Sequence, residues 1–156
     1  MPAWITTYLQ HEPHDLDAAA IRRGIAPADW LTLGEDFDVH ADAVERFMRD
    51  LQWSDEPLQF GLPDGRPVRV RVWTGADRVE EELSELPPQQ GAVREHLTDT
   101  CAIVAIELGY SQLRTMHEVV AFEIAYWLAA RFAGVILAPD DRWYDHDEHR
   151  WEPMEG

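Results

Sequence analysis

Histidine and acidic side chains gather near both ends of the chain, in combinations that can bind a metal ion. They are His11, Glu12, His14 and Asp15 in the first group, and Asp140, Asp141, Asp145, His146, Asp147, Glu148 and His149 in the second. Neutral imidazole and carboxylate together suit zinc, manganese or iron. If the fold brings the two groups together, their four histidines and nearby acids would serve a metal-dependent hydrolase. Neither group has an established metal-ligand spacing, so we expect a solvated polar tail from about residue 145 and no metal or other cofactor.

The sequence patterns of nucleophilic and phosphate chemistry are incomplete or missing. His117 and Glu118 begin the pattern of a metalloprotease helix, but Ala121 stands where its second histidine would be. No serine lies in a Gly-x-Ser-x-Gly elbow, and no glycine-rich phosphate loop is present. Cys101 is the only cysteine and lies in an apolar run, so we expect a small core residue. We therefore predict no catalytic residue and a protein that is not an enzyme.

Two further carboxylates fall within apolar segments. A buried carboxylate can act as an acid or base of raised pKa. Glu107 comes near the end of an apolar strand pattern, and Glu123 lies in an apolar helix pattern. We expect the first at the strand end and the second at the exposed edge of its helix, with no catalytic role for either.

The charge balance says most about partners. Thirty acidic residues oppose thirteen basic ones, all of them arginine, and the formal net charge at pH 7 is −17. Such a field repels nucleic acid and anionic lipid, so we expect contact with neither nucleic acid nor membrane. It attracts a cationic partner and speeds association in a salt-sensitive way.

Acidic runs beside tryptophan supply candidate contacts for a basic partner. An exposed tryptophan surrounded by acid is a suitable anchor for such a surface. The predicted partner-binding residues are Glu80, Glu81, Glu82, Asp140, Asp141 and Trp143.

Hydrophobic periodicity predicts a single domain over residues 1–156. Helices are expected over 15–23, 38–51 and 113–133, with a short acidic helix or loop over 77–86 and a helical turn over 92–97. Strands are expected over 4–9, 101–108, 135–137 and 142–144, with a hairpin over 58–74, whereas residues 25–34 receive no assignment.

The expected elements combine into an α+β fold. The hairpin requires antiparallel pairing, whereas the helix over 113–133 is long enough to cross between parallel strands. The near-continuous apolar run over 101–108 is typical of a central strand covered on both faces. We therefore predict a mixed β-sheet with helices packed mainly on one face.

The C-terminal third carries a resemblance to a known group of proteins. Leu128-Ala129-Ala130-Arg131-Phe132-Ala133-Gly134 runs into Val135-Ile136-Leu137-Ala138-Pro139-Asp140, and Arg142-Trp143-Tyr144 follows. This helix–glycine–strand ending resembles small acidic α+β immunity proteins of bacterial polymorphic-toxin systems. It carries over no catalytic residue. The resemblance implies an antidote that binds one cognate toxin domain, with a basic surface, and covers its active site.

Two other functions stay open alongside this one. The first is the metal-dependent hydrolase built on the terminal histidine clusters. The second is a regulatory subunit, such as a phage-encoded acidic inhibitor or an adaptor, which would share the acidic surface. The single cysteine and the lack of a visible signal peptide predict a cytoplasmic, reducing location.

Overall fold

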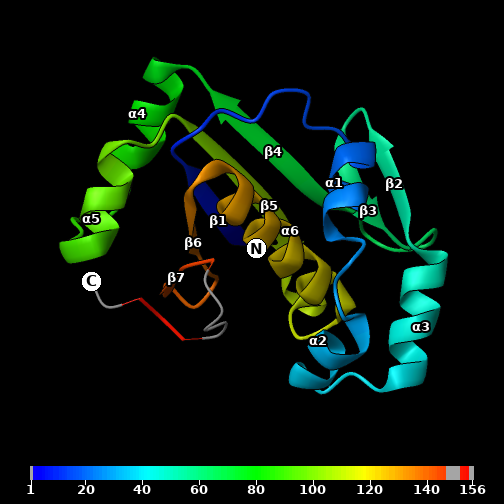
Figure 1. The fold of residues 1–156 in the computed structure, drawn as a ribbon. Helices are drawn as coiled ribbons and strands as arrows, with labels where there is room; N and C mark the ends of the chain where they lie inside the picture. Colours follow the sequence, from blue (N-terminus) through cyan, green and yellow to red (C-terminus); the bar gives the residue numbers. More distant parts are fainter. Residues whose placement is uncertain (1, 147–151, 155–156) are drawn as a thin grey trace.

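Short strands with alternating apolar residues form one antiparallel sheet in the computed structural model, which describes residues 2–146 and 152–154 (Figure 1). The strands are β1 (Pro2–Leu9), β2 (Gln52–Asp55), β3 (Leu58–Gly61), β4 (Val68–Thr74), β5 (Ala102–Gly109), β6 (Gly134–Leu137) and β7 (Trp143–Tyr144). Their order across the sheet is β2-β3-β4-β5-β1-β6-β7.

Helices fill the long connections between strands. They are α1 (Ala18–Ile25), α2 (Trp30–Asp36), α3 (Ala41–Asp50), α4 (Ala76–Ser84), α5 (Gly91–Thr98) and α6 (Met116–Phe132), with a short 3₁₀ turn over Tyr110–Gln112. The side chain of Asp17 caps α1, and Asp29 does the same for α2. None of the helices among the described residues has the length and hydropathy that crossing a bilayer requires.

The helix α6 connects two strands that run in the same direction but do not touch. Both β5 and β6 pair antiparallel with β1, which lies between them. The expected crossover helix is therefore present, but the expected mixed sheet is not: every strand pair in the described part of the chain is antiparallel. The difference arises because β1 takes the central place and supplies antiparallel edges to both of its neighbours.

Helices packed on an antiparallel sheet confirm the α+β class. The two faces of the sheet carry separate hydrophobic clusters. Ile5 and Leu9 of β1 face the larger cluster, which α6 builds with residues from α1, α2 and α3. Tyr8 and Ile103 point to the opposite face and meet α4 and α5. In Figure 1, α6 lies in front of β1 and β5 and follows their direction, with α1 to α3 on one side of it and α4 and α5 on the other. The helices α1, α2, α3 and α6 thus pack on one face of the sheet and only α4 and α5 on the other, so the helices lie mainly on one face, as predicted.

Three elements differ from the sequence-based expectation. Residues 25–34 contain the first part of α2, the strand β2 was not expected, and residues 91–98 form a complete helix, α5, rather than one turn. Cys101 is exposed because it precedes β5, which begins at the next residue. Its backbone N–H still donates a hydrogen bond of 2.8 Å to the Leu9 carbonyl. The expected burial of Cys101 is therefore wrong.

Candidate functional site

A pocket opens where the end of α2, the start of α6 and the β6–β7 turn meet. Its volume is about 460 Å³, within the usual range for small-ligand sites. We call it the carboxylate pocket, and its lining residues are Asp36, Phe37, Leu113, Arg114, Glu118, Phe122, Ala138, Pro139, Asp140 and Tyr144.

Glu118 is the most enclosed acidic group of this pocket. Thr115 caps α6 by accepting a hydrogen bond from the His117 N–H, which places Glu118 in the first helical turn. Only 9% of Glu118 is exposed, and its Oε2 accepts a long hydrogen bond of 3.4 Å from the Arg114 N–H. Burial raises the pKa of Glu118, and the negative charge of Asp140 adds to this effect, while Arg114 opposes it.

Asp140 and Tyr144 form the opposite wall. The Asp140 Oδ1 accepts a hydrogen bond of 3.0 Å from the Arg142 N–H, and its Oδ2 accepts one of 3.5 Å from the Tyr144 hydroxyl. Burial raises the pKa of Tyr144, with a further contribution from Asp140, so this hydroxyl stays protonated and donates. These bonds fix the direction of the Asp140 carboxylate.

The backbone around the pocket adopts an uncommon conformation. Asp38, Arg114 and Asp141 have positive φ angles of 61°, 60° and 66°. Non-glycine residues rarely take this left-handed conformation, and such strain is often found at functional sites. The Arg114 guanidinium turns outward, where its Nη2 lies 3.3 Å from the Asp38 Oδ2 and its side chain is 71% exposed.

His117 precedes Glu118 but takes no part in the pocket. Its ring packs edge-on against Phe47, with 4.8 Å between ring centroids, and burial lowers its pKa. The incomplete His117–Glu118 pattern is therefore split between a half-buried histidine packed on Phe47 and a carboxylate in the pocket.

The arrangement can hold a positively charged organic group. Three acidic residues, Asp36, Glu118 and Asp140, line the pocket beside aromatic rings, with Arg114 as the one basic residue of the lining. Carboxylates attract a cation directly, and aromatic faces attract it through their quadrupoles. Metal binding is a poorer fit, because no group of three or more His, Cys, Asp or Glu side chains in the described part of the chain is arranged to hold a metal ion.

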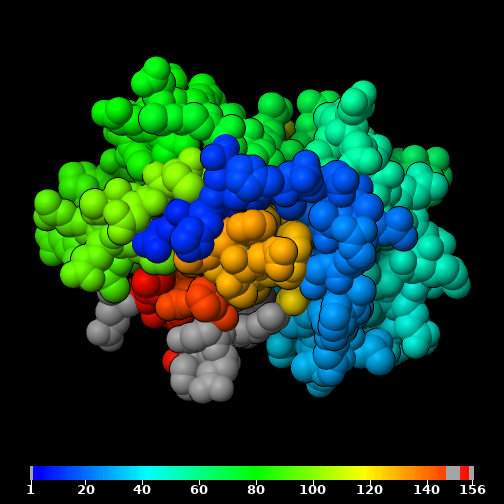
Figure 2. Space-filling model, turned by 45° about the horizontal axis from the view of Figure 1, so that its top comes forward, coloured from blue at the N-terminus to red at the C-terminus, as the bar shows by residue number. Residues whose placement is uncertain are grey.

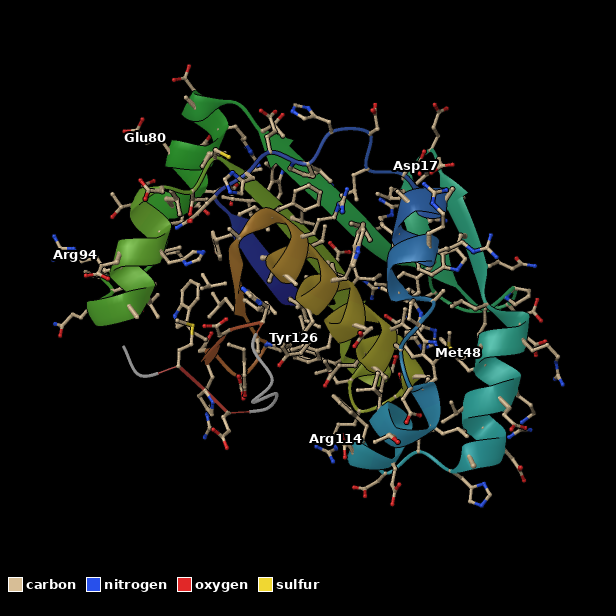
Figure 3. The ribbon with its side chains drawn as sticks, viewed as in Figure 1. Asp17, Met48, Glu80, Arg94, Arg114 and Tyr126 are labelled. Atoms are coloured by element: carbon tan, nitrogen blue, oxygen red, sulfur yellow. The ribbon has the colours of Figure 1, made fainter. Side chains whose placement is uncertain are left out.

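The predicted partner-binding residues fall in two separate regions. Glu80, Glu81 and Glu82 lie on α4, where Arg78 pairs with Glu81 at 3.6 Å and with Glu82 at 2.8 Å. Figure 3 shows Glu80 on α4 far across the molecule from Arg114, which marks the carboxylate pocket. Of the predicted residues, Asp140 lines the pocket and Asp141 is exposed beside it.

Trp143 does not project from the surface as expected. Only 7% of it is exposed, and its ring packs against Tyr8 with 5.4 Å between centroids. The expectation of an exposed tryptophan is wrong because β7 pairs with β6 and turns Trp143 into the cluster beneath α4 and α5.

The terminal histidine groups are not seen to converge. Glu12, His14 and Asp15 line a different pocket, together with Arg23 and Arg131. In Figure 2 the blue segment after β1 lies against the orange end of α6, and the His11 N–H donates to the Phe132 carbonyl at 3.1 Å. Of the second group, Asp147, Glu148 and His149 lie outside the described residues, which contain no metal-binding group.

The other two carboxylates differ from each other in environment. Glu107 lies on the sheet face opposite α6, 3.4 Å from Arg66 and 3.9 Å from Arg71, so arginines gather on this face. Glu123 is only 8% exposed, so its expected place at an exposed helix edge is wrong. The helix α6 is buried on nearly all sides and offers no such edge there.

Sequence reasoning missed most of the pocket. One signal was available: Glu118 and Phe122 are four residues apart and therefore lie on one face of α6. Comparisons of the chain with protein-family models, curated proteins and solved structures find no match.

Proposed function

We propose that this chain is an immunity-type inhibitor that binds a cognate bacterial toxin domain in the cytoplasm and covers its active site. The observation that supports this most is the carboxylate pocket, whose lining has three acidic residues and one arginine, on a chain of net charge −17. A basic partner is the complement of such a site.

The rest of the surface suits the same role. Glu80 and Glu81 are exposed on α4, and they strengthen the negative field that steers a basic protein toward the chain. A toxin that acts on nucleic acid has a basic cleft, and carboxylates can occupy the positions where phosphates would bind. The arginines around Glu107 mark the face that a basic partner would avoid.

The decisive experiment joins capture to inhibition. The chain is used as bait in a lysate of its native organism at low and high salt, and retained proteins are identified by mass spectrometry. The recombinant partner is then titrated with the chain in an assay of its own activity. We expect one stoichiometric partner with a basic domain, whose activity is lost at equimolar chain.

Two results would contradict the proposal. One is the absence of any stoichiometric partner at low salt. The other is a partner whose activity the chain leaves intact, which would favour a regulatory subunit or adaptor.

The contribution of α4 can be measured separately. The double variant Glu80→Lys/Glu81→Lys should slow association with the partner roughly tenfold at low salt, with the effect shrinking as salt is added. The matched control is Asp42→Lys/Glu45→Lys, which makes the same charge change on exposed positions of α3. Equal slowing by both variants would remove α4 from the interface and leave a net-charge effect.

A further inference from the structure

We infer that the carboxylate pocket is the receptor for one arginine side chain of the partner protein. The inference deepens the proposed function, and it rests on that function only for the molecule that carries the arginine. The chemistry of the pocket can be tested without the partner.

Glu118 lacks a full set of hydrogen-bond donors. The residue is nine-tenths buried, and the only hydrogen bond to its carboxylate within the described residues is the 3.4 Å contact to Oε2. Its Oε1 accepts none from the described residues and is not one of their fully enclosed, unpartnered polar atoms, so it stays open to a donor that enters the pocket. A guanidinium in the pocket would supply such a donor to a largely desolvated carboxylate.

The nearby arginines of the chain do not donate to Glu118 through their guanidinium groups. The guanidinium of Arg114 lies against Asp38 and is mostly solvent-exposed. The Nε of Arg142 lies 3.9 Å from the Oδ2 of Asp140, and the Arg142 side chain is also largely exposed. With Asp36 added, the charged groups around Glu118 leave the pocket negative.

The aromatic rings beside the pocket favour arginine over other cations. Phe122 lies between two other rings, with centroids 6.2 Å from Phe37 and 6.5 Å from Tyr144. A planar guanidinium can stack on such faces while it donates two parallel hydrogen bonds to a carboxylate, whereas an ammonium is compact and more strongly hydrated. A volume of about 460 Å³ leaves room for the guanidinium and its methylene stem.

The chemistry is tested by NMR titration of the isotope-labelled chain. The probes are ethylguanidinium, ethylammonium and the neutral isostere ethylurea. We expect ethylguanidinium to shift the amide signals of Phe37, Ala138 and Tyr144, ethylammonium to bind more weakly, and ethylurea to leave these signals in place.

Two variants localise the binding. Glu118→Gln keeps the shape of the side chain and should weaken ethylguanidinium binding roughly tenfold. Phe37→Leu keeps an apolar wall without the ring and should weaken it a few-fold. Glu45→Gln on α3 removes an exposed charge that does not line the pocket and should leave ethylguanidinium binding unchanged.

The partner then tests the occupant. Glu118→Gln should speed dissociation of the complex. For one arginine of the partner, replacement by lysine should weaken binding to the wild-type chain but cause no further loss of affinity when the chain already carries Glu118→Gln. The inference is overturned if ethylurea or ethylammonium binds as well as ethylguanidinium, or if Glu118→Gln changes neither probe nor partner binding. Neither result changes the outcome of the inhibition assay, so the arginine-binding pocket and the inhibitor function can be disproved independently.

Discussion

At the scale of single residues, Glu118 shows what a sequence pattern carries and what it lacks. Its four-residue spacing from Phe122 places both on one face of α6, and this could be read from the chain. The pocket itself could not, because Asp36 and Asp140 come from α2 and the β6–β7 turn. Only tertiary packing brings them beside α6. The same limit explains Trp143, whose charged neighbours in sequence say nothing of the aromatic cluster that buries it.

Replacing Glu118 by glutamine should stabilise the free protein at neutral pH, by on the order of 1 kcal/mol, because it removes a poorly solvated charge. The raised pKa of Glu118 means that the folded state keeps its proton to higher pH than the unfolded state. The contribution of Glu118 to the free energy of unfolding is therefore most favourable below the ordinary glutamate pKa. It is lost as the pH rises through the raised pKa of the folded state. The gain from Glu118→Gln should thus grow from acid to neutral pH.

Urea unfolding of both proteins at a series of pH values measures this. The charged groups that face Glu118 are Asp36, Asp140, Arg114 and, beyond Asp140, Arg142. The exposed variant Glu80→Gln serves as control and should run parallel to the wild type. Parallel profiles for Glu118→Gln as well would mean that Glu118 does not retain its proton on folding.

At the scale of elements, strongly periodic segments could be predicted and short ones could not. The hairpin, α3, α6 and β5 follow patterns long enough to be read from the sequence alone. The strand β2 has four residues, and only Trp53 points toward the core, so it shows no periodicity. The helix α2 has seven residues and contains Gly34, which weakens its pattern. Pairing of β5 and β6 with β1 depends on strand order, which no local pattern encodes.

The contact between α1 and α6 depends on one small residue. A Cβ at Gly24 would overlap the indole ring of Trp127, whereas a Cβ at Gly65 would meet only ordinary contacts 3.9 Å away. Gly24→Ala should lower the free energy of unfolding by about 1 kcal/mol net, since overpacking exceeds the gain in helix propensity. Gly65→Ala should stay within about 0.5 kcal/mol of the wild type. Chemical denaturation of the pair checks this, and an equally stable Gly24→Ala would show that Trp127 moves aside freely.

At the scale of the whole molecule, the excess of negative charge opposes compactness. A net charge of −17 on 156 residues creates repulsion that folding must overcome, and arginines relieve it only locally, as between Arg78 and Glu82. The same excess would attract the basic partner proposed above, so in that case recognition of the partner and stability of the free chain would make opposite demands on the net charge.

Added salt should therefore stabilise the free chain. Screening shortens the range of repulsion, and the midpoint of thermal unfolding should rise by a few degrees between low and physiological ionic strength. Differential scanning calorimetry in increasing sodium chloride measures it, with an uncharged solute at equal osmolality as control. A midpoint that falls with salt would mean that local ion pairs outweigh the net repulsion.

The central place of β1 has a consequence for synthesis on the ribosome. Pro2 pairs with Gly109 and Leu9 with Gly134, so β1 is translated well before both of its neighbours and meets them only after β5, α6 and β6 have emerged. Until then the aromatic and β-branched segment Trp4–Leu9 has two open edges, which can pair with other nascent chains. Such long sequence separation also slows folding. In the interval between the synthesis of β1 and that of β6, the sheet that covers both edges of β1 in the folded protein therefore cannot protect them from aggregation.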